Sequence, residues 1–513
     1  MSVVLACDLG GTSFRAALVD DTGATRAEAT IRGPVILDRM GGAEVDAKEW
    51  WRVLVEAAGQ LAEAEPGLFA GIGAIAICGV TRTQVFLGRD NRQIRPAITW
   101  KDMRSEGAAA RFRARVEGEH PELERVNAFH PLARLAFLKE EEEAGFRALA
   151  MVVEPKDYLN FRLTGRLASD PVSMARLAAA AKPQGTADLF AVLGLPRSIV
   201  PPLLEPWEVL APVAAGLPAP FDRLAGVPVL VSSSDTWVAA AGLGAMRAGF
   251  GYNISGTTEV FGVVGETPSF AEGLLTVDWR GLHQLGGPSQ TGADTMSWLV
   301  ELLRGDAAGL SEAVASLLAA PRHPQPVIFL PYLQGERVPY WDPSLRGAFI
   351  GLNRAHKPVD LAYAVIEGVA FLNRLVLERA EAATGERVSE IRFGGGAAVN
   401  PVWRQVKADI CGRPVVAGEA REPGLLGAAM LAFTGTGRFP DLAAAQEAMV
   451  RIAARHVPDP KRRAVYDALY ALFRDAEASV APVSRGLAGL ARRAGALPGV
   501  NASSLSDNEE HRS

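Results

Sequence analysis

A glycine turn between two apolar segments near the N-terminus constrains the fold of this 513-residue chain most. Residues 3–8 and 14–20 are predicted strands, joined by Gly10-Gly11-Thr12-Ser13. Backbone amides in such a turn form an anion-binding concavity, and the hydroxyl groups and Arg15 add donors for phosphate oxygens. Asp8, at the end of the first strand, can hold Mg²⁺ through its water shell. The alternative is a hairpin whose glycines only turn the chain.

A glycine turn with hydroxyl residues recurs in the second half of the chain, where predicted strands 250–255 and 260–265 flank Gly256-Thr257-Thr258. A two-lobed nucleotide-binding protein that arose by internal duplication would leave such an echo, although two unrelated hairpins would look the same. A helix over 49–64 and a buried strand over 72–77 indicate an α/β fold. The length exceeds one ordinary core and predicts two domains.

Ser232-Ser233-Ser234-Asp235 follows a predicted strand over 227–232 and precedes a helix over 237–243. A carboxylate at the carboxyl end of a strand in an α/β fold points toward the ligand crevice. Asp235 can therefore accept the proton of an attacking hydroxyl group. The alternative is an N-cap, because Ser and Asp routinely begin helices.

Two further segments carry ligand-binding chemistry. Gly394-Gly395-Gly396 follows a strand, but Val399 stands where a dinucleotide fingerprint needs its third glycine, so a Rossmann site is disfavoured. The glycines still let an adenine or ribose approach the backbone. Asp102 and Arg104 follow a short strand and match the vicinal hydroxyls of a sugar or polyol, unless both are simply surface charges.

Several classes of protein are disfavoured. The chain has no Gly-Lys dipeptide, so it has no P-loop lysine, and it lacks the His-Arg-Asp and Asp-Phe-Gly elements of protein kinases. A net charge of −5 without a basic cluster predicts neither a nucleic-acid nor a membrane partner. Three dispersed cysteines indicate a reducing compartment. Without a signal peptide or a long apolar span, we expect a cytoplasmic protein.

These segments, in this order, resemble the FGGY family of carbohydrate kinases from about residue 3 to residue 434. The most specific stretch is Gly347-x-Phe349-x-Gly351-Leu352, followed after seven residues by Asp360-Leu361-x-x-Ala364-Val365-Ile366-Glu367-Gly368. Supporting segments are Pro155-Lys156-Asp157-Tyr158-Leu159, Ser169-Asp170, Gly335-Glu336-Arg337-x-Pro339 and Glu422-Pro423-Gly424-Leu425-Leu426-Gly427-Ala428-Ala429.

The resemblance implies an α/β fold of two actin-like (ribonuclease H-like) ATPase domains, with ATP, Mg²⁺ and the sugar in the cleft between them. We expect residues 1–247 to form the N-terminal domain with the sugar site, the first phosphate loop and the catalytic aspartate. Residues 248–483 would form the nucleotide-binding C-terminal domain. Residues 484–513 are small, polar and charged, which predicts a mobile tail. By analogy with the family, a homodimer is expected.

The resemblance also implies a role for each matching residue. Asp235 is similar to the catalytic base and Asp8 to the Mg²⁺-associated carboxylate. The first phosphate loop would comprise Gly11, Thr12, Ser13 and Arg15, and the second would comprise Gly256 and Thr257. The adenosine site would comprise Gly395, Gly396 and Asn400. The sugar site would comprise Thr81, Arg82, Asp102 and Asp235.

Departures from the family pattern concern the substrate. Thr81-Arg82 stands where glycerol kinases carry Arg-Glu and xylulokinases commonly carry Met-His. Ser233-Ser234 replace the glycines often found before the catalytic aspartate, and Glu259 stands where a small residue is usual. The first expectation is phosphorylation of a primary hydroxyl of a ketopentose such as xylulose. Erythritol, ribulose, gluconate or a related polyol or sugar acid stays open. A non-catalytic actin-fold ATPase or a sugar sensor is the alternative of another class.

Overall fold

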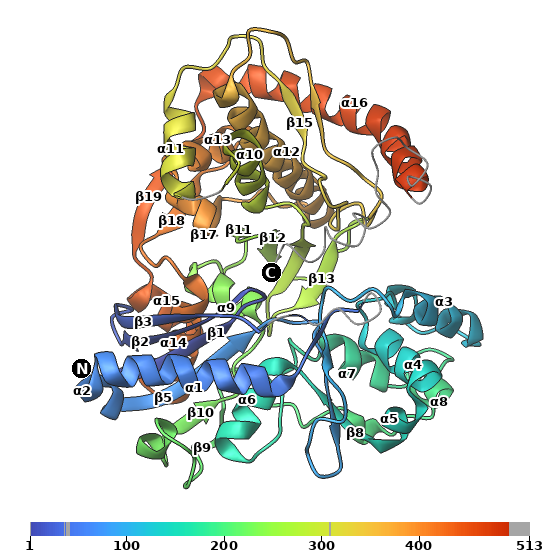
Figure 1. Ribbon diagram of the computed structural model, residues 1–513, viewed down its shortest axis with the longest axis vertical. Helices are drawn as coiled ribbons and strands as arrows, with labels where there is room; N and C mark the ends of the chain where they lie inside the picture. Colours follow the sequence, from blue (N-terminus) through green and yellow to red (C-terminus); the bar gives the residue numbers. More distant parts are fainter. Residues whose placement is uncertain (1, 35, 37–41, 307–308, 492–513) are drawn as a thin grey trace. The chain divides into compact units, whose positions relative to one another are not determined.

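The computed structural model describes residues 2–34, 36, 42–306 and 309–491 (Figure 1). The chain divides into two compact units. Unit 1 comprises Met1–Gly242 and Glu422–Val450, and unit 2 comprises Leu243–Arg421 and Arg451–Ser513. The sequence predicted one domain boundary, near residue 247. The segment Glu422–Val450, which lies beyond that boundary, belongs to unit 1. Within the described residues, no helix has both the length and the apolar character needed to cross a bilayer.

Unit 1 is built on a six-stranded sheet in the order β3-β2-β1-β5-β10-β9. Its central strands β1, β5 and β10 run parallel, and β2, β3 and β9 are antiparallel to their neighbours. Parallel strands are covered on both faces, which explains why β1 and β5 are almost continuously apolar. The strands are β1 Val3–Leu9, β2 Ser13–Asp20, β3 Thr25–Arg32, β4 Glu44–Val45, β5 Ile72–Gly79, β6 Val85–Gly88, β7 Ala97–Ile98, β8 Leu149–Val153, β9 Val209–Pro212 and β10 Pro228–Leu230.

Helix α1 shows how the sequence sets a helix of unit 1. Asp46 caps its first turn by accepting a hydrogen bond from the backbone N–H of Lys48 at 2.9 Å. Apolar residues at helical spacing, such as Val53, Leu54 and Leu61, are buried in the core of the unit. The helices of unit 1 are α1 Ala47–Ala64, α2 Pro66–Ala70, α3 Glu106–Arg115, α4 Pro131–Glu141, α5 Glu143–Ala148, α6 Pro155–Thr164, α7 Ala175–Ala181, α8 Leu189–Leu193, α9 Asp235–Gly242, α14 Pro423–Gly435 and α15 Leu442–Met449.

Helices α9 and α14 cross at very close range inside unit 1. A Cβ atom on Gly242 would lie 1.9 Å from the carbonyl oxygen of Pro423, and one on Gly427 would lie 1.9 Å from that of Val238. No side chain fits at either position, so glycine permits this crossing. Helix α14 also packs against β1 and β5, which brings residues from opposite ends of the sequence beneath the strand ends.

Unit 2 repeats the topology of unit 1. Its seven-stranded sheet has the order β13-β14-β12-β11-β17-β18-β19. The hairpin β11–β12 pairs with β14, and β17 lies parallel to β11, as the hairpin β1–β2 pairs with β3 and β5 lies parallel to β1. The predicted echo is therefore a duplicated topology. The strands are β11 Phe250–Ser255, β12 Glu259–Gly265, β13 Leu275–Asp278, β14 His283–Pro288, β15 Ile328–Leu330, β16 Ala348–Ile350, β17 Glu390–Gly395, β18 Val415–Gly418 and β19 Ile452–His456.

The core of unit 2 gathers around helix α12, which is buried along most of its length. The helices are α10 Asp294–Arg304, α11 Leu310–Ala319, α12 Pro358–Thr384, α13 Pro401–Cys411 and α16 Pro460–Ala491. Helix α16 continues to Ala491, and buried side chains such as Glu477 and Ser484 lie on one face of its second half. Of the predicted tail, residues 484–491 lie in this helix and residues 492–513 lie outside the described residues.

Candidate active site

Three predicted site segments meet at one edge of the sheet in unit 1. Asp8 is the second-last residue of β1, Thr81 and Arg82 follow β5, and Asp235 follows β10. These strands are neighbours and run parallel, so their carboxyl ends share an edge, and Gly79 is bridged to Ser234 there. The structure thus brings the predicted magnesium ligand, sugar loop and base to the same edge.

Both carboxylates at this edge have raised pKa values. Burial and then the charge of Asp235 raise the pKa of Asp8 to about 7, although Arg15 opposes this. Burial raises the pKa of Asp235 to about 6, although the Thr236 N–H, which donates to Asp235 Oδ1 at 2.6 Å, lowers it. Asp8 Oδ1 is buried and has no hydrogen-bond partner among the described residues. A pair of carboxylates in this state attracts a proton or a cation.

A pH-dependent stability follows from these pKa values. An unfolded aspartate titrates near pH 3.9, so the stability that Asp235 contributes in its protonated form is lost as pH rises from about 4 through its folded pKa of about 6. In the absence of nucleotide and Mg²⁺, we expect Asp235→Asn to raise the free energy of unfolding at pH 8 by about 1–3 kcal/mol. The gain should vanish near pH 4, as measured by urea unfolding across this range.

Asp20 is the matched control in the same unit. It is fully buried, but its carboxylate accepts hydrogen bonds from Thr22, Ala24 and Arg26, which outweigh burial and lower its pKa. Its stabilising contribution is present above pH 4, so Asp20→Asn should lower the stability at pH 8. If both substitutions shift stability in the same direction at pH 8, the assignment of opposite pKa shifts is wrong.

A buried polar network holds the backbone that leads into Asp235. Ser232 has a φ of 58°, a left-handed conformation that is costly for a residue other than glycine. Ser233 Oγ donates to Asp170 Oδ1 at 2.7 Å. Lys156 Nζ lies 2.5 Å from Asp157 Oδ1 and 3.0 Å from Asp170 Oδ2. These interactions fix the strained turn, so Ser233 has a structural partner where the family usually carries a small residue.

The predicted first phosphate loop forms a tight, accessible turn. The N–H of Gly10 donates to the carbonyl oxygen of Ser13 at 3.0 Å, and Gly11 and Thr12 are exposed. The indole of Trp100 lies over Gly11, where a Cβ would be 3.3 Å from its Nε1. Arg15 Nε lies 3.3 Å from Glu422 Oε1 at the start of α14. Gly11 and Thr12 thus lie in the turn itself, whereas Ser13 and Arg15 lie at the start of β2.

Arg134, which the sequence analysis missed, organises the sugar loop. Its guanidinium is fully buried and donates to the carbonyl oxygen of Arg82, to Gln84 Oε1 and, at 2.7 Å, to the carbonyl oxygen of Thr99. Arg82 itself has a φ of 56°. The buried cation thus ties the Thr81–Arg82 segment to the segment that leads to Asp102. An arginine inside the apolar run 131–138 was the signal that could have revealed it.

Asp102, which is predicted to contact the sugar, already accepts hydrogen bonds from groups of the protein. It is 1% exposed and accepts hydrogen bonds from Arg104 Nη2 at 2.6 Å and from the N–H of Ala43 at 2.9 Å. Burial would raise its pKa, but these bonds lower it. Asp102 therefore stays charged and orients Arg104.

In unit 2, the predicted nucleotide segments leave adjacent parallel strands. Gly256 and Thr257 follow β11, are exposed, and lie at the same sheet edge as the glycines that end β17. Gly395 has a φ of 90°, and a Cβ there would lie 2.2 Å from the carbonyl oxygen of Ser255. Gly396 is exposed, whereas Asn400 Oδ1 caps α13 by accepting from the N–H of Val402 at 2.9 Å. The two predicted loops of unit 2 are thus neighbours.

A buried ion pair lies directly after the second predicted phosphate loop. Lys407 Nζ is 3.0 Å from both carboxylate oxygens of Glu259 and 2.6 Å from Asn253 Oδ1. Asn373 Nδ2 donates to Glu259 Oε2 at 3.0 Å. Both charged side chains are 1% exposed. The unusual Glu259 is therefore neutralised inside unit 2 by a lysine from α13.

The residues of unit 1 fit a magnesium ion better than a metal held by protein alone. Among the described residues, no group of three or more His, Cys, Asp or Glu side chains could hold a metal ion. Mg²⁺ is commonly bound through one or two carboxylates together with water and substrate phosphates. Asp8, with its unpartnered buried oxygen, fits that mode.

Relatives of known activity match nearly the whole chain. A xylulose kinase from Bacillus subtilis (strain 168) is 26% identical, with 93% of this chain and 96% of that protein covered. A glycerol kinase from Delftia acidovorans is 31% identical, with 85% of this chain and 91% of that protein covered. The crystal structure of xylulose kinase from Rhodospirillum rubrum is 26% identical, has a TM-score of 0.79, and is covered over 94% of this chain and 99% of its own.

The duplicated actin-like α/β architecture, together with the relatives that share it, identifies a phosphotransferase that acts on alcohol groups. The N-terminal domain of the FGGY family of carbohydrate kinases matches residues 3–242, and the C-terminal domain of that family matches residues 251–436. This chain belongs to the FGGY family of carbohydrate kinases. Sugar kinases of this family use ATP.

Proposed function

We propose that this chain transfers the γ-phosphoryl group of ATP to a primary hydroxyl group of a ketopentose, with xylulose as the preferred acceptor. The observation that carries the proposal is the shared strand edge in unit 1, where Asp8, the Thr81–Arg82 loop and Asp235 lie at or after the carboxyl ends of three adjacent parallel strands. The similarity to xylulose kinases over more than nine tenths of the chain favours a ketopentose.

Asp235 would act as the general base. Its raised pKa of about 6 lies close enough to neutral pH for the carboxylate to accept a proton as the sugar hydroxyl attacks phosphorus. The Lys156–Asp170–Ser233 network would hold this carboxylate in position. Mg²⁺ associated with Asp8 would supply neutralisation of charge on the phosphate oxygens.

The remaining predicted residues would hold the nucleotide. The amides and hydroxyls of Gly11, Thr12 and Ser13, with Arg15, would bind phosphate oxygens from unit 1. The loop at Gly256 and Thr257 would do so from unit 2, with Gly395, Gly396 and Asn400 near the adenosine. Because phosphoryl transfer needs positioning more than covalent catalysis, these contacts would hold the triphosphate in line with the acceptor hydroxyl and keep water away from it.

A coupled ADP-release assay tests the substrate. With xylulose, ribulose, erythritol, glycerol and gluconate compared at equal concentration, we expect kcat/KM to be highest for xylulose, by about tenfold or more. A higher kcat/KM for glycerol or gluconate would show that this compound, and not a ketopentose, is the preferred acceptor. ADP release that does not depend on any acceptor would instead indicate a non-catalytic ATPase of the same fold.

A further inference from the structure

Segment 289–294 of unit 2 backs the second predicted phosphate loop. The N–H of Ala293 donates to the carbonyl oxygen of Gly256 at 3.1 Å. Gly292 packs so closely behind the loop that a Cβ there would lie 2.5 Å from the carbonyl carbon of Thr258. Because the loop rests on this segment, the position of the loop depends on where the segment lies.

Glu336 holds the segment with its carboxyl group. The side chain is buried, and its Oε2 accepts hydrogen bonds from Ser289 Oγ and Thr291 Oγ1, each at 2.9 Å. Its Oε1 accepts from the N–H of Gln290 at 2.6 Å and from the N–H of Arg337 at 2.7 Å. Three consecutive residues of the segment therefore converge on one carboxyl group. A buried network that is satisfied in this way rigidifies the segments that it joins.

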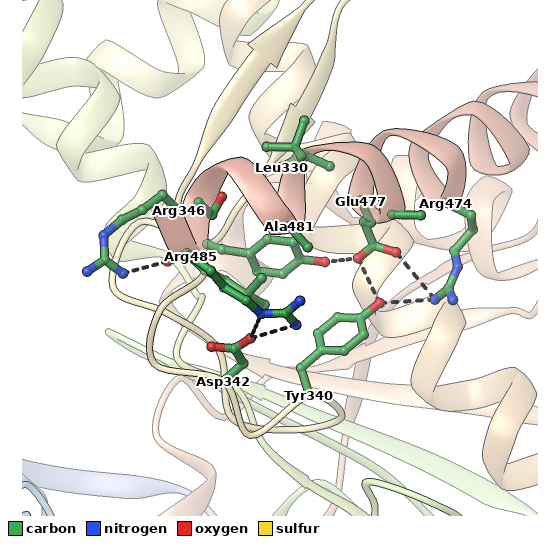
Figure 2. A pocket seen from close by; sticks show the side chains of 13 residues that line it. Leu330, Tyr340, Asp342, Arg346, Arg474, Glu477, Ala481 and Arg485 are labelled. Carbon is green, nitrogen blue, oxygen red and sulfur yellow. Dashed lines mark hydrogen bonds and ion pairs between the residues drawn. The ribbon is translucent and has the colours of Figure 1, made fainter. Parts of the chain in front are cut away.

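The turn that carries Glu336 is itself held in place. The N–H of Glu336 donates to the carbonyl oxygen of Asp342 at 3.0 Å, and the N–H of Asp342 donates back at 2.9 Å. The carboxylate of Asp342 pairs with Arg485 of α16 at 3.0 Å, and the hydroxyl of Tyr340 donates to Glu477 of the same helix at 2.8 Å (Figure 2). The turn is therefore anchored to α16 as well as to the segment behind the loop.

The hydroxyl protons around Glu336 show which side chains fit this position. Thr291 Oγ1 lies 2.9 Å from both Glu336 Oε2 and the carbonyl oxygen of Pro331. One hydroxyl group has one proton, so Thr291 can donate to only one of these acceptors. A proton on Glu336 Oε2 lets Glu336 donate to Thr291 while Thr291 donates to Pro331. Burial raises the pKa of Glu336 to about 7, although the hydrogen bonds that it accepts lower it. Glutamine, which carries N–H groups in place of that proton, therefore fits the network.

We propose that Glu336 is a positioning residue for the nucleotide, because it fixes segment 289–294 and thereby the second phosphate loop. The inference rests on the proposed function, in which that loop binds phosphate oxygens of ATP. Glu336 acts through the segment, so it sets the affinity for the nucleotide and not the chemistry at the acceptor. Arg337 supports the same segment, since its Nη2 donates to the carbonyl oxygen of Ser289 at 2.6 Å.

Calorimetric titration of the full chain with ADP in the presence of Mg²⁺ tests the proposal. Glu336→Ala removes the acceptor shared by Ser289, Gln290 and Thr291, and we expect the Kd for ADP to rise by about tenfold or more. Glu336→Gln keeps an acceptor for the two N–H groups and donors for the hydroxyls, so its Kd should stay within about threefold of wild type. Thr291→Val removes one hydroxyl and keeps the shape of the side chain, and should raise the Kd by about three- to fivefold. This milder variant carries the test if Glu336→Ala does not fold.

Steady-state kinetics separate positioning of the nucleotide from a general loss of structure. In the ADP-release assay, Glu336→Ala should raise the KM for ATP by about tenfold or more, as for the Kd. The KM for the sugar at saturating ATP should stay within about threefold of wild type, because the predicted sugar site lies in unit 1.

Glu367→Ala is the matched control. Glu367 is also buried in unit 2, where it pairs with Arg322 and accepts a hydrogen bond from the hydroxyl of Tyr466 at 3.1 Å. Burial raises the pKa of Glu367 as well. Its removal should destabilise unit 2, but its partners lie on other segments, so the Kd for ADP should change by less than about twofold.

Two results would overturn the inference. The first is a Kd for ADP that neither Glu336→Ala nor Thr291→Val changes by more than about twofold. The second is an equal loss of affinity in Glu367→Ala, which would trace the effect to the stability of unit 2 as a whole. A wild-type chain that binds no ADP would overturn the proposed function and this inference with it, which distinguishes that failure from the other two.

Discussion

Replacement of Asp235 by asparagine is expected to lower kcat by about 10²-fold or more, the low end of what a general base contributes. Asparagine keeps the shape of the side chain and can still accept the hydrogen bond from Thr236, so the strained turn at Ser232 should persist. What is lost is the ability to take the proton of the sugar hydroxyl. The measurement is steady-state kcat with the best acceptor of the ADP-release screen.

Two further measurements separate catalysis from binding and folding. The ADP affinity of Asp235→Asn should stay within about threefold of wild type, because the proposed nucleotide contacts lie on other loops. Asp46→Asn is the matched control, since asparagine caps a helix as well as aspartate does, and it should keep its kcat. A kcat for Asp235→Asn within about threefold of wild type would remove Asp235 from the role of base.

Replacement of Lys407 by methionine is expected to lower the free energy of unfolding of unit 2 by about 3–5 kcal/mol. Glu259 would then be a buried carboxylate whose remaining partners are the amides of Asn253 and Asn373. Desolvation of this charge would no longer be offset by the ammonium group at 3.0 Å. Hydrogen exchange of the β11 and β17 amides reports the local stability of this region.

The double variant Lys407→Met/Glu259→Gln tests the coupling. With both charges gone, we expect it to regain about 2 kcal/mol or more relative to Lys407→Met alone. Arg463→Met is the control, because Arg463 pairs with Asp467 at 2.9 Å with both side chains more than 40% exposed, and it should cost less than about 1 kcal/mol. A double variant no more stable than Lys407→Met would show that the loss comes from packing and not from the unpaired charge.

The main elements and the duplication were accessible from the sequence because they depend on local patterns. Apolar runs of strand length, glycine turns and helical periodicity are encoded in short windows, so β1–β2, β11–β12 and α1 fall close to where they were predicted. Family motifs extended this to the kinase class. Less patterned elements such as β3 and β14 were missed, because the inward positions of β3 are mostly small alanines and β14 contains two glycines followed by a proline.

Some residues of the candidate site could be located from the sequence, and others could not. Asp8, Asp235 and the glycine loops stand at strand ends, which a sequence pattern can locate, and their assigned roles stay predictions. The ion pair of Arg15 with Glu422, whose positions lie at opposite ends of the sequence, depends on packing that no local window contains. The same holds for Arg134, whose acceptors lie 35 to 52 residues away in the chain.

The sequence by itself determined the class of fold, the duplicated hairpins and the chemistry at the strand ends, because each depends on residues close together along the chain. Only the tertiary structure decided which charges become neutralised and which surfaces stay open. Glu259 is unusual in the sequence, but its partner Lys407 is 148 residues away and reaches it only when α13 packs on the sheet. On α16, Glu477 likewise meets the hydroxyls of Tyr332 and Tyr340 only in the folded chain. Burial and long-range pairing are properties of the packed chain, since they depend on which distant segments exclude water from each side chain.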